Sequence, residues 1–235
     1  GFSALSALTT GTVNTGLGVR AGLVLTEGDR NTFVGKDAGD SATLINDAVL
    51  IGHDAGHTIS TSTAVDGTVA IGSSALAALT SGAGNLAIGF EALKALTSGQ
   101  YNTAIGYKAL NVHTTGDKNI AIGYHAMRDT DAGSNSLNSV GNVFIGYNAG
   151  SGTWADNDST YNIGIGPHVL QDALNGVGGN IAMGLSALQD LTGGNHNVSL
   201  GYQAGMAITT GDNNVLASRV AGTSLTTGDN NIMLG

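Results

Sequence analysis

Short strings of alternating polar and apolar residues recur along the chain. The strings NLAIGFEAL at 85–93, NTAIGYKAL at 102–110 and NIAIGYHAM at 119–127 are near copies of one another. Each begins with asparagine, places apolar residues at alternate positions and then reaches a glycine. Side chains alternate between the two faces of a strand, so this pattern predicts a short β-strand that ends at the glycine.

This glycine recurs at a nearly constant interval, and we call it the anchor. Nine of the thirteen intervals between anchors are 17 residues long, and the others are 20, 23, 20 and 18. Repeats of paired helices and propeller blades need roughly 33 residues or more, and leucine-rich repeats need about 20–29 with a different leucine spacing. The anchors are Gly1, Gly18, Gly35, Gly52, Gly72, Gly89, Gly106, Gly123, Gly146, Gly166, Gly184, Gly201, Ser218 and Gly235.

A period of 17 residues fits one coil of a parallel β-solenoid, in which each coil pairs with the next at about 4.8 Å. We therefore predict an all-β, single-domain β-helix or β-roll of about 13 coils that covers residues 1–235 as one repeat array. Such a stack would be on the order of 60 Å long. A left-handed hexapeptide helix is a weaker alternative, because the coils show no six-residue sub-period.

Aliphatic residues precede the anchor in nearly every coil, and others stand two positions earlier. Stacked coils would place these residues in columns and bury a continuous core of Ile, Val, Leu and Ala, which a single coil cannot do. Alanine stands three residues after the anchor in twelve coils, which predicts close backbone approach there. The predicted isoleucine column comprises Ile51, Ile71, Ile88, Ile105, Ile122, Ile145 and Ile165.

Asparagine stands four residues before the anchor in eleven coils, and only Ala48 and Thr68 interrupt the series. Its amide has donors and an acceptor, so stacked amides can bond from coil to coil. The alternative is a set of unrelated turn asparagines, although a turn would also accept Asp, Ser or Gly. The predicted ladder comprises Asn14, Asn31, Asn85, Asn102, Asn119, Asn142, Asn162, Asn180, Asn197, Asn214 and Asn231.

The segment after the anchor has two forms. Some coils contain Ala-Leu-x-x-Leu, as at 75–79 and 92–96, a spacing that predicts a short helical turn. Others contain Ala-Gly, as at 21–22 and 38–39, and are expected to be flatter. A Thr-Gly pair, as at 115–116, marks a second turn where glycine supplies a positive φ.

Enlarged coils are expected at 52–72, 123–146 and 146–166. Insertions in solenoids form surface loops, often on a binding face. The loop at 151–158 holds the one tryptophan of the chain, so Trp154, Asp156 and Asp158 are candidate glycan contacts. The alternative is that Trp154 covers a small core within its own loop.

Composition limits the partners. Eight Lys and Arg against 17 Asp and Glu give a net charge of −9, so we expect no nucleic-acid binding. No apolar run reaches the roughly 18 residues of a membrane span, so we expect no membrane insertion. Cysteine is absent, which excludes disulfides and thiolate metal sites. Both ends of the sequence have the same repeat phase without a capping segment, which predicts a piece of a longer shaft or copies stacked head to tail.

Candidate chemistry is sparse, and we expect no catalysis and no required cofactor. The carboxylates are scattered over turns. His53 and His57 are four residues apart, but Gly56 argues against a helical metal pair. The Gly-Asp-Asn-Asn segments at 211–214 and 228–231 resemble calcium turns but lack the nine-residue register of a calcium-binding roll.

Aromatic residues directly follow several anchors and predict a stripe. It is either a partly buried aromatic stack or a row that binds sugars. Its members are Phe2, Phe90, Tyr107, Tyr124, Tyr147 and Tyr202.

The repeated N-x-A-I-G-Y-x-A-L unit, as at Asn102, Ala104, Ile105, Gly106 and Ala109, resembles the glycine-rich repeats of bacteriophage tail-fibre proteins. It is more distantly similar to the head repeats of trimeric autotransporter adhesins, whose unit is shorter. The resemblance implies an extracellular or virion-surface fibre, commonly trimeric, that attaches to a host or surface. The self-cleaving chaperone domain of such tail fibres has no counterpart here.

The sequence therefore predicts a non-catalytic structural fibre or shaft that self-associates as a trimer or a head-to-tail filament. Cell-surface glycans are candidate partners. Two alternatives are an ice-binding solenoid, suggested by the recurring threonines, and a carbohydrate-processing β-helix like a tailspike. The second would need a pair of carboxylates in a cleft, and the sequence offers no convincing pair.

Overall fold

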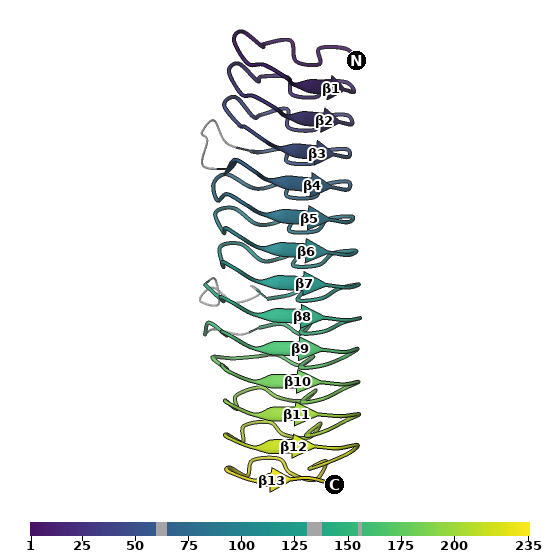
Figure 1. Cartoon of the computed structure of the whole chain (residues 1–235), viewed down its shortest axis with the longest axis vertical. Coiled ribbons are helices and arrows are strands. Elements are labelled where there is room, and N and C mark those ends of the chain that lie inside the picture. Colours follow the sequence, from purple (N-terminus) through teal and green to yellow (C-terminus); the bar gives the residue numbers. More distant parts are fainter. Residues whose placement is uncertain (60–64, 131–137, 155–156) are drawn as a thin grey trace. The chain divides into compact units, whose positions relative to one another are not determined.

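The computed structural model describes residues 1–59, 65–130, 138–154 and 157–235 of the chain. Its contacts divide the chain into two compact units, residues 1–116 and 117–235. Both units consist of the same kind of coil, with one short strand per coil (Figure 1). The prediction of an all-β parallel β-solenoid with coils of about 17 residues is confirmed.

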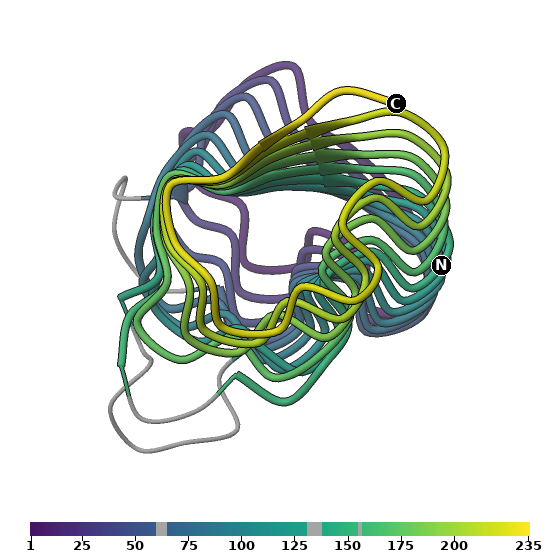
Figure 2. The same ribbon diagram turned by 90° about the horizontal axis from the view of Figure 1, so that it is seen from below.

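Strands in each unit pair in parallel with the next strand along the chain. The end view in Figure 2 shows that the strands form one side of each coil and turns form the others. The first unit contains β1 (Thr15–Leu17), β2 (Thr32–Val34), β3 (Val49–Ile51), β4 (Val69–Ile71), β5 (Leu86–Ile88) and β6 (Thr103–Ile105). The second contains β7 (Ile120–Ile122), β8 (Val143–Ile145), β9 (Ile163–Ile165), β10 (Ile181–Met183), β11 (Val198–Leu200), β12 (Val215–Ala217) and β13 (Ile232–Met233).

The anchor glycine is required for two reasons. At Gly89, φ is +135°, a conformation that L-residues rarely adopt. A Cβ added there would also lie 2.3 Å from the carbonyl oxygen of Gly106 in the next coil. Glycine therefore recurs because the coils stack too closely at this corner for a side chain.

The predicted helical turn after the anchor is wrong, and the described residues contain no α-helix. In the coil that follows Gly89, Glu91 and Leu93 both have a positive φ, near +50°. Their N–H groups donate to carbonyls of neighbouring coils, from Glu91 to Ser73 at 2.9 Å and from Leu93 to Ala109 at 3.0 Å. Backbone groups bonded to the coils on either side cannot form the i to i−4 bonds of a helix.

Coils with Ala-Gly follow the same path as coils with Ala-Leu. Gly39, four residues after its anchor, has φ +58°, close to the +49° of Leu93 at the equivalent position. We call this the left-handed position. The expectation that the Ala-Gly coils would be flatter is therefore not met.

The isoleucine column lies in register, but its assignment to the core is wrong. Ile71 pairs with Ile88 in the first unit, and Ile122 pairs with Ile145 in the second. The two outer residues of each strand point away from the core, and Ile165 is 37% exposed. Only the central residue points inward, because side chains alternate along a three-residue strand.

The core consists of the strand-centre residue, the alanine three after the anchor, the left-handed residue and a further leucine or isoleucine. Sizes at the strand centre and the left-handed position are complementary. A Cβ added at Gly39 would lie 2.8 Å from Phe33 and 2.9 Å from Leu50, the strand centres on either side. Where the left-handed residue is leucine, as in Leu93, the strand centres Ala87 and Ala104 are small.

The enlarged coils keep the strand register. Ile51 pairs with Ile71 across the coil at 52–72, and Ile145 pairs with Ile165 across the coil at 146–166. Parts of the three insertions lie outside the described residues. The strands on either side of these two coils therefore pair in the same register as the strands of the 17-residue coils.

Candidate functional site

The asparagine column forms continuous hydrogen bonds within stretches of each unit. Asn197 donates its backbone N–H at 2.9 Å and its Nδ2 at 3.1 Å to Oδ1 of Asn180, and its Nδ2 also donates to the Gly211 carbonyl at 2.8 Å. Its own Oδ1 accepts the same two donors from Asn214. Asparagine is needed because one side chain must accept from a neighbouring coil and donate to a carbonyl.

The two interruptions of the column adapt differently. The N–H of Ala48 still donates to Oδ1 of Asn31 at 3.0 Å, although Ala48 offers no acceptor to the next coil. Thr68 donates its hydroxyl to the Val65 carbonyl at 2.6 Å. The column members lie at Asn14, Asn31, Asn85 and Asn102 in the first unit, and at Asn119, Asn142, Asn162, Asn180, Asn197, Asn214 and Asn231 in the second.

The structure contains a second polar column, six residues before the anchor, that the sequence analysis did not predict. Asp212 accepts the N–H of Asn195 at 2.6 Å, and Asp229 accepts the N–H of Asp212 at 2.7 Å. Two hydrogen bonds from Thr12, its backbone N–H and its hydroxyl, lower the pKa of Asp29. The Gly-Asp-Asn segments that resemble calcium turns therefore use a carboxylate oxygen to bond the preceding coil. The sequence does carry a signal for this column, because Asp or Asn recurs six residues before the anchor.

Threonine hydroxyls at the second turn also bond between coils. Thr97 donates to the Thr114 carbonyl at 3.0 Å, and Thr209 donates to the Thr226 carbonyl at 3.2 Å. An ice-binding face needs an array of threonines on one side of a strand. These hydroxyls lie at a turn and already have a partner in the next coil.

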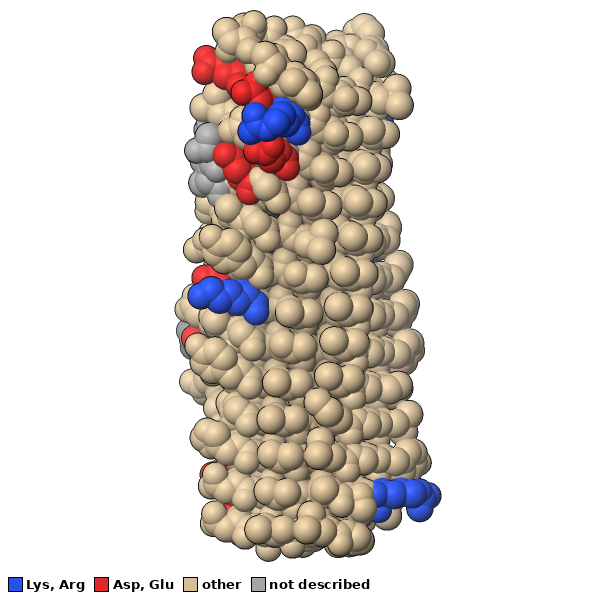
Figure 3. All heavy atoms as spheres, viewed as in Figure 1, with Lys and Arg blue, Asp and Glu red and all other residues tan. Residues whose placement is uncertain are grey.

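The outer face of the strands forms a partly exposed apolar surface in each unit. It consists of the first and third residues of the strands, which are Ile, Val, Leu, Met, Thr or Ala in β1–β12. We call it the outer sheet face. Figure 3 shows charged side chains along the borders of the face that it draws, while the area over the strands carries none. Two parallel columns of mainly aliphatic side chains, two residues apart along each strand, are left partly exposed.

Neighbouring rings of the aromatic stripe stack face to face on one another. The Phe90 and Tyr107 rings are stacked at 5.3 Å, as are the Tyr124 and Tyr147 rings. These side chains are 42–50% exposed. A sugar stacks on the face of a ring, so rings that stack on one another offer it mainly their edges. This geometry favours the interpretation as a structural stack.

Trp154 is fully buried. Its Nε1 donates to the Gly150 carbonyl at 3.2 Å, and its ring packs edge to face against Phe144. A buried indole cannot stack on a sugar, so the predicted glycan contact through Trp154 is wrong. Asp156 lies outside the described residues. Asp158 is exposed and accepts the N–H of Asn138 at 3.0 Å.

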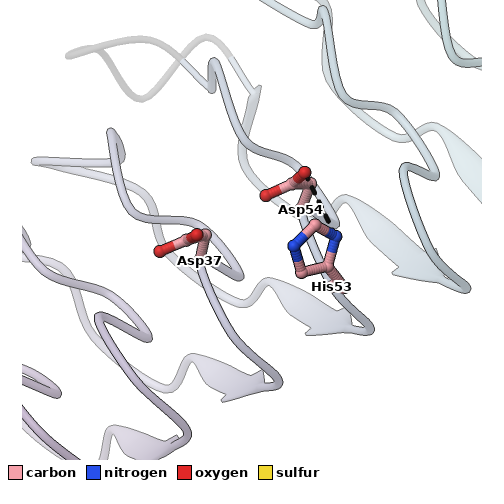
Figure 4. Close-up of side chains that lie close together, drawn as sticks. All are labelled: Asp37, His53 and Asp54. Carbon is pink, nitrogen blue, oxygen red and sulfur yellow. Dashed lines mark ion pairs between the residues drawn. The ribbon is translucent and has the colours of Figure 1, made fainter.

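A cluster of charged residues and histidines lies in the first unit. Asp37, His53 and Asp54 bring their oxygen and nitrogen atoms within 4.8 Å of one another (Figure 4). Arg20 donates to Asp37 at 2.6 Å, and Lys36 contacts its other oxygen. These hydrogen bonds, first from Arg20 and then from Lys36, hold the pKa of Asp37 down to about 2.

This cluster has the donor types of a metal site, but its two cations already neutralise the one buried carboxylate. Nδ1 of His53 lies 3.2 Å from a carboxylate oxygen of Asp54, whereas Nδ1 of His57 lies 2.8 Å from a carboxylate oxygen of Asp40. The two histidines thus have different carboxylate partners. We interpret the cluster as an ion-pair network that joins consecutive coils.

A polar cleft of about 490 Å³ lies in the second unit, beside the enlarged coils. Four consecutive coils line it, with Arg128 and Asp129 in the first, Ser151 and Gly152 in the second, Asp172 in the third and Thr192 in the fourth. Burial and the charge of Asp172 raise the pKa of Asp190 in the following coil. The sequence indicated the region through its insertions, but it did not identify these residues.

Within the described ranges, no helix has the length and hydropathy needed to cross a membrane. No protein-family model matches the chain, and it matches neither a curated protein nor a solved structure.

Proposed function

We propose that this chain is a non-catalytic structural fibre or shaft that acts outside the cell or on a virion surface, in attachment to a host or another surface. The observation that carries the proposal is the repeated bonding of each coil to the next. Backbone pairing, the asparagine column and the threonine hydroxyls all act along the stacking direction. Such a protein is built by repetition and presents a long, uniform surface.

Self-association of this fibre is proposed through the outer sheet face, and the partner is a second copy of the chain. The outer residues of β1–β12 carry no charged side chain, so the face provides no ion pair for a charged ligand. Its aliphatic ridges recur at the strand spacing of about 4.8 Å. A second copy presents ridges at the same spacing, so the two faces can interdigitate along many coils.

The size of the face can be compared with that of a known interface. A strip that follows the seven strands of the second unit is about 34 Å long and, with three residues per strand, about 10 Å wide, or about 340 Å² per copy. Stable protein interfaces bury about 800 Å² per partner, so this strip alone would supply nearly half of one.

Negative-stain microscopy and light scattering test the proposal. We expect particles of constant width in the images and a solution mass of at least two copies. Ile165→Lys places a charge in the outer sheet face and should reduce the mass to that of one chain. Gln203→Lys is the matched control, because Lys108 already occupies the equivalent position in another coil.

Particles without a fibre form would contradict the structural role. A wild-type mass of one chain at every concentration would contradict association through the face. An Ile165→Lys variant that keeps the wild-type mass would contradict it as well.

A further inference from the structure

The polar cleft of the second unit has features of a built site. Gly152 lines the cleft, and a Cβ there would lie 2.3 Å from the Gln171 carbonyl oxygen. No other residue fits there without moving the backbone of the next coil. Ser151 and Gly152 are small, whereas the preceding coil carries Arg128 and the following coil carries Gln171. Longer side chains from the coils on either side therefore flank these two small residues.

The walls present many hydrogen-bonding groups at short range. Arg128 donates its Nε to Asp129 at 2.9 Å, and its guanidinium also contacts Nδ1 of His125 at 3.3 Å. His168 bonds the Gln171 amide oxygen at 2.7 Å and so fixes that side chain. Asn148 adds a further amide to the lining. Donors and acceptors are thus interspersed over the whole cleft.

An aromatic rim adjoins these polar groups. The His125 ring, which lines the cleft, stacks on the Tyr124 ring at 3.9 Å between centroids. Tyr124 is 43% exposed. Apolar ring edges beside amides, an arginine and carboxylates suit a ligand with both hydroxyls and C–H groups.

The charges of the cleft favour a neutral ligand. Arg128 is already paired with Asp129, so its charge is locally balanced. Asp172 adds a negative charge to the lining. An anionic group would meet this charge without a free cation among the lining residues, whereas carboxylates and amides readily accept hydroxyl hydrogens.

We propose that this cleft binds a neutral saccharide unit of a surface glycan, with Asp172, Asn148 and Gln171 bonding its hydroxyls beside the Tyr124–His125 rim. The proposal deepens the attachment role given above, and it rests on that role for its biological meaning. It also replaces the predicted contact at Trp154 with a cleft formed by the same enlarged coils. The cleft volume lies in the range of small-ligand sites.

The test is a glycan array of neutral oligosaccharides built from glucose, galactose, mannose and N-acetylhexosamines, probed with the full chain. Saturation-transfer NMR with the strongest binder then gives Kd. We expect Asp172→Ala and Asn148→Gly each to weaken binding about tenfold or more, since each removes a hydrogen bond to the ligand. Glycine suits position 148, where φ is +52°.

Two controls match these variants. Asp158→Asn removes an exposed charge elsewhere in the second unit and keeps an acceptor for Asn138. Gln203→Gly makes the same backbone change as Asn148→Gly in a coil outside the cleft, at φ +53°. Both should bind as the wild type does, and circular dichroism should show that no variant melts below the wild type, since glycine relieves the left-handed φ at positions 148 and 203.

Three results would overturn the proposal: no binding to any neutral glycan, binding only to sialylated or sulfated glycans, or unchanged affinity in both cleft variants. Microscopy of the same samples separates the two hypotheses. Fibres that bind no glycan would overturn the cleft proposal alone, and glycan binding by particles without a fibre form would overturn the structural role alone.

Discussion

Exchanging the sizes of Ala70 and Leu76 tests whether the core is packed by a local rule. Leu76 occupies the left-handed position of its coil, and Ala70 is the strand centre six residues earlier. The double variant Ala70→Leu, Leu76→Gly copies the arrangement of the preceding coil, where Leu50 and Gly56 stand at these positions. A Cβ at Gly56 would lie 2.9 Å from Leu50, so Leu50 fills the space that leucine fills elsewhere.

Each single substitution should destabilise the protein. Ala70→Leu adds atoms beside a fully buried Leu76 and should cost about 1–3 kcal/mol through overpacking. Leu76→Gly removes a buried side chain, a loss of about 2–5 kcal/mol. Relief of the left-handed φ of +50° returns about 1–2 kcal/mol of this, so the net cost is about 2 kcal/mol.

The double variant should lose less than the two single variants together, with a favourable coupling of about 2 kcal/mol. The assay is urea unfolding followed by circular dichroism for the wild type and the three variants under one buffer condition. The pair Ala70→Leu, Leu93→Gly is the control, because Leu93 belongs to a later coil and does not border position 70. Additive losses in the Ala70–Leu76 pair, or an equal coupling in the control pair, would refute the packing rule.

Three further predictions concern the backbone and the polar groups. Asn197→Ala should cost about 1–3 kcal/mol, because two donors of Asn214 and the Gly211 carbonyl lose their partner; unchanged urea unfolding would contradict the column. Asp37→Asn should make stability depend less on pH in the acid range. The lowered pKa of Asp37 means that its charge stabilises the fold above the ordinary pKa of 3.8, and this contribution is lost as the pH falls towards about 2. Melting temperatures measured across that range check it, and parallel curves for wild type and variant would count against the ion pairs. Val220→Gly should raise stability by about 1 kcal/mol, because a β-branched residue is strained at φ +57°; a lower melting temperature would argue against this strain.

The sequence predicts the period, the strands and the asparagine column well, because each depends on one residue type at one position. Glycine recurs at the anchor, as at Gly89, because a side chain there would meet the backbone of the next coil. Asparagine recurs in its column, as at Asn197, because its amide both accepts and donates hydrogen bonds between coils. Such constraints leave the same residue type in nearly every coil.

The direction of the side chains is harder to predict. A strand of three residues has alanine inside and isoleucine outside, as at Ala87 and Ile88, so hydrophobicity alone chooses the wrong face. The inner position is small because a leucine from the left-handed position fills the space, and the positive φ of that leucine is not apparent from residue type. The cleft combines loop positions of four consecutive coils, which no single repeat position reveals.

The direction of the bonds between coils has a mechanical consequence. In either unit, the hydrogen bonds between strands run along the stacking axis, whereas the covalent chain runs around it. A pull along that axis would open the bonds one coil at a time instead of shearing many together. Each released coil of 17 residues would add up to about 55 Å of extended chain. A tether made of such coils would therefore lengthen in steps under load before it broke.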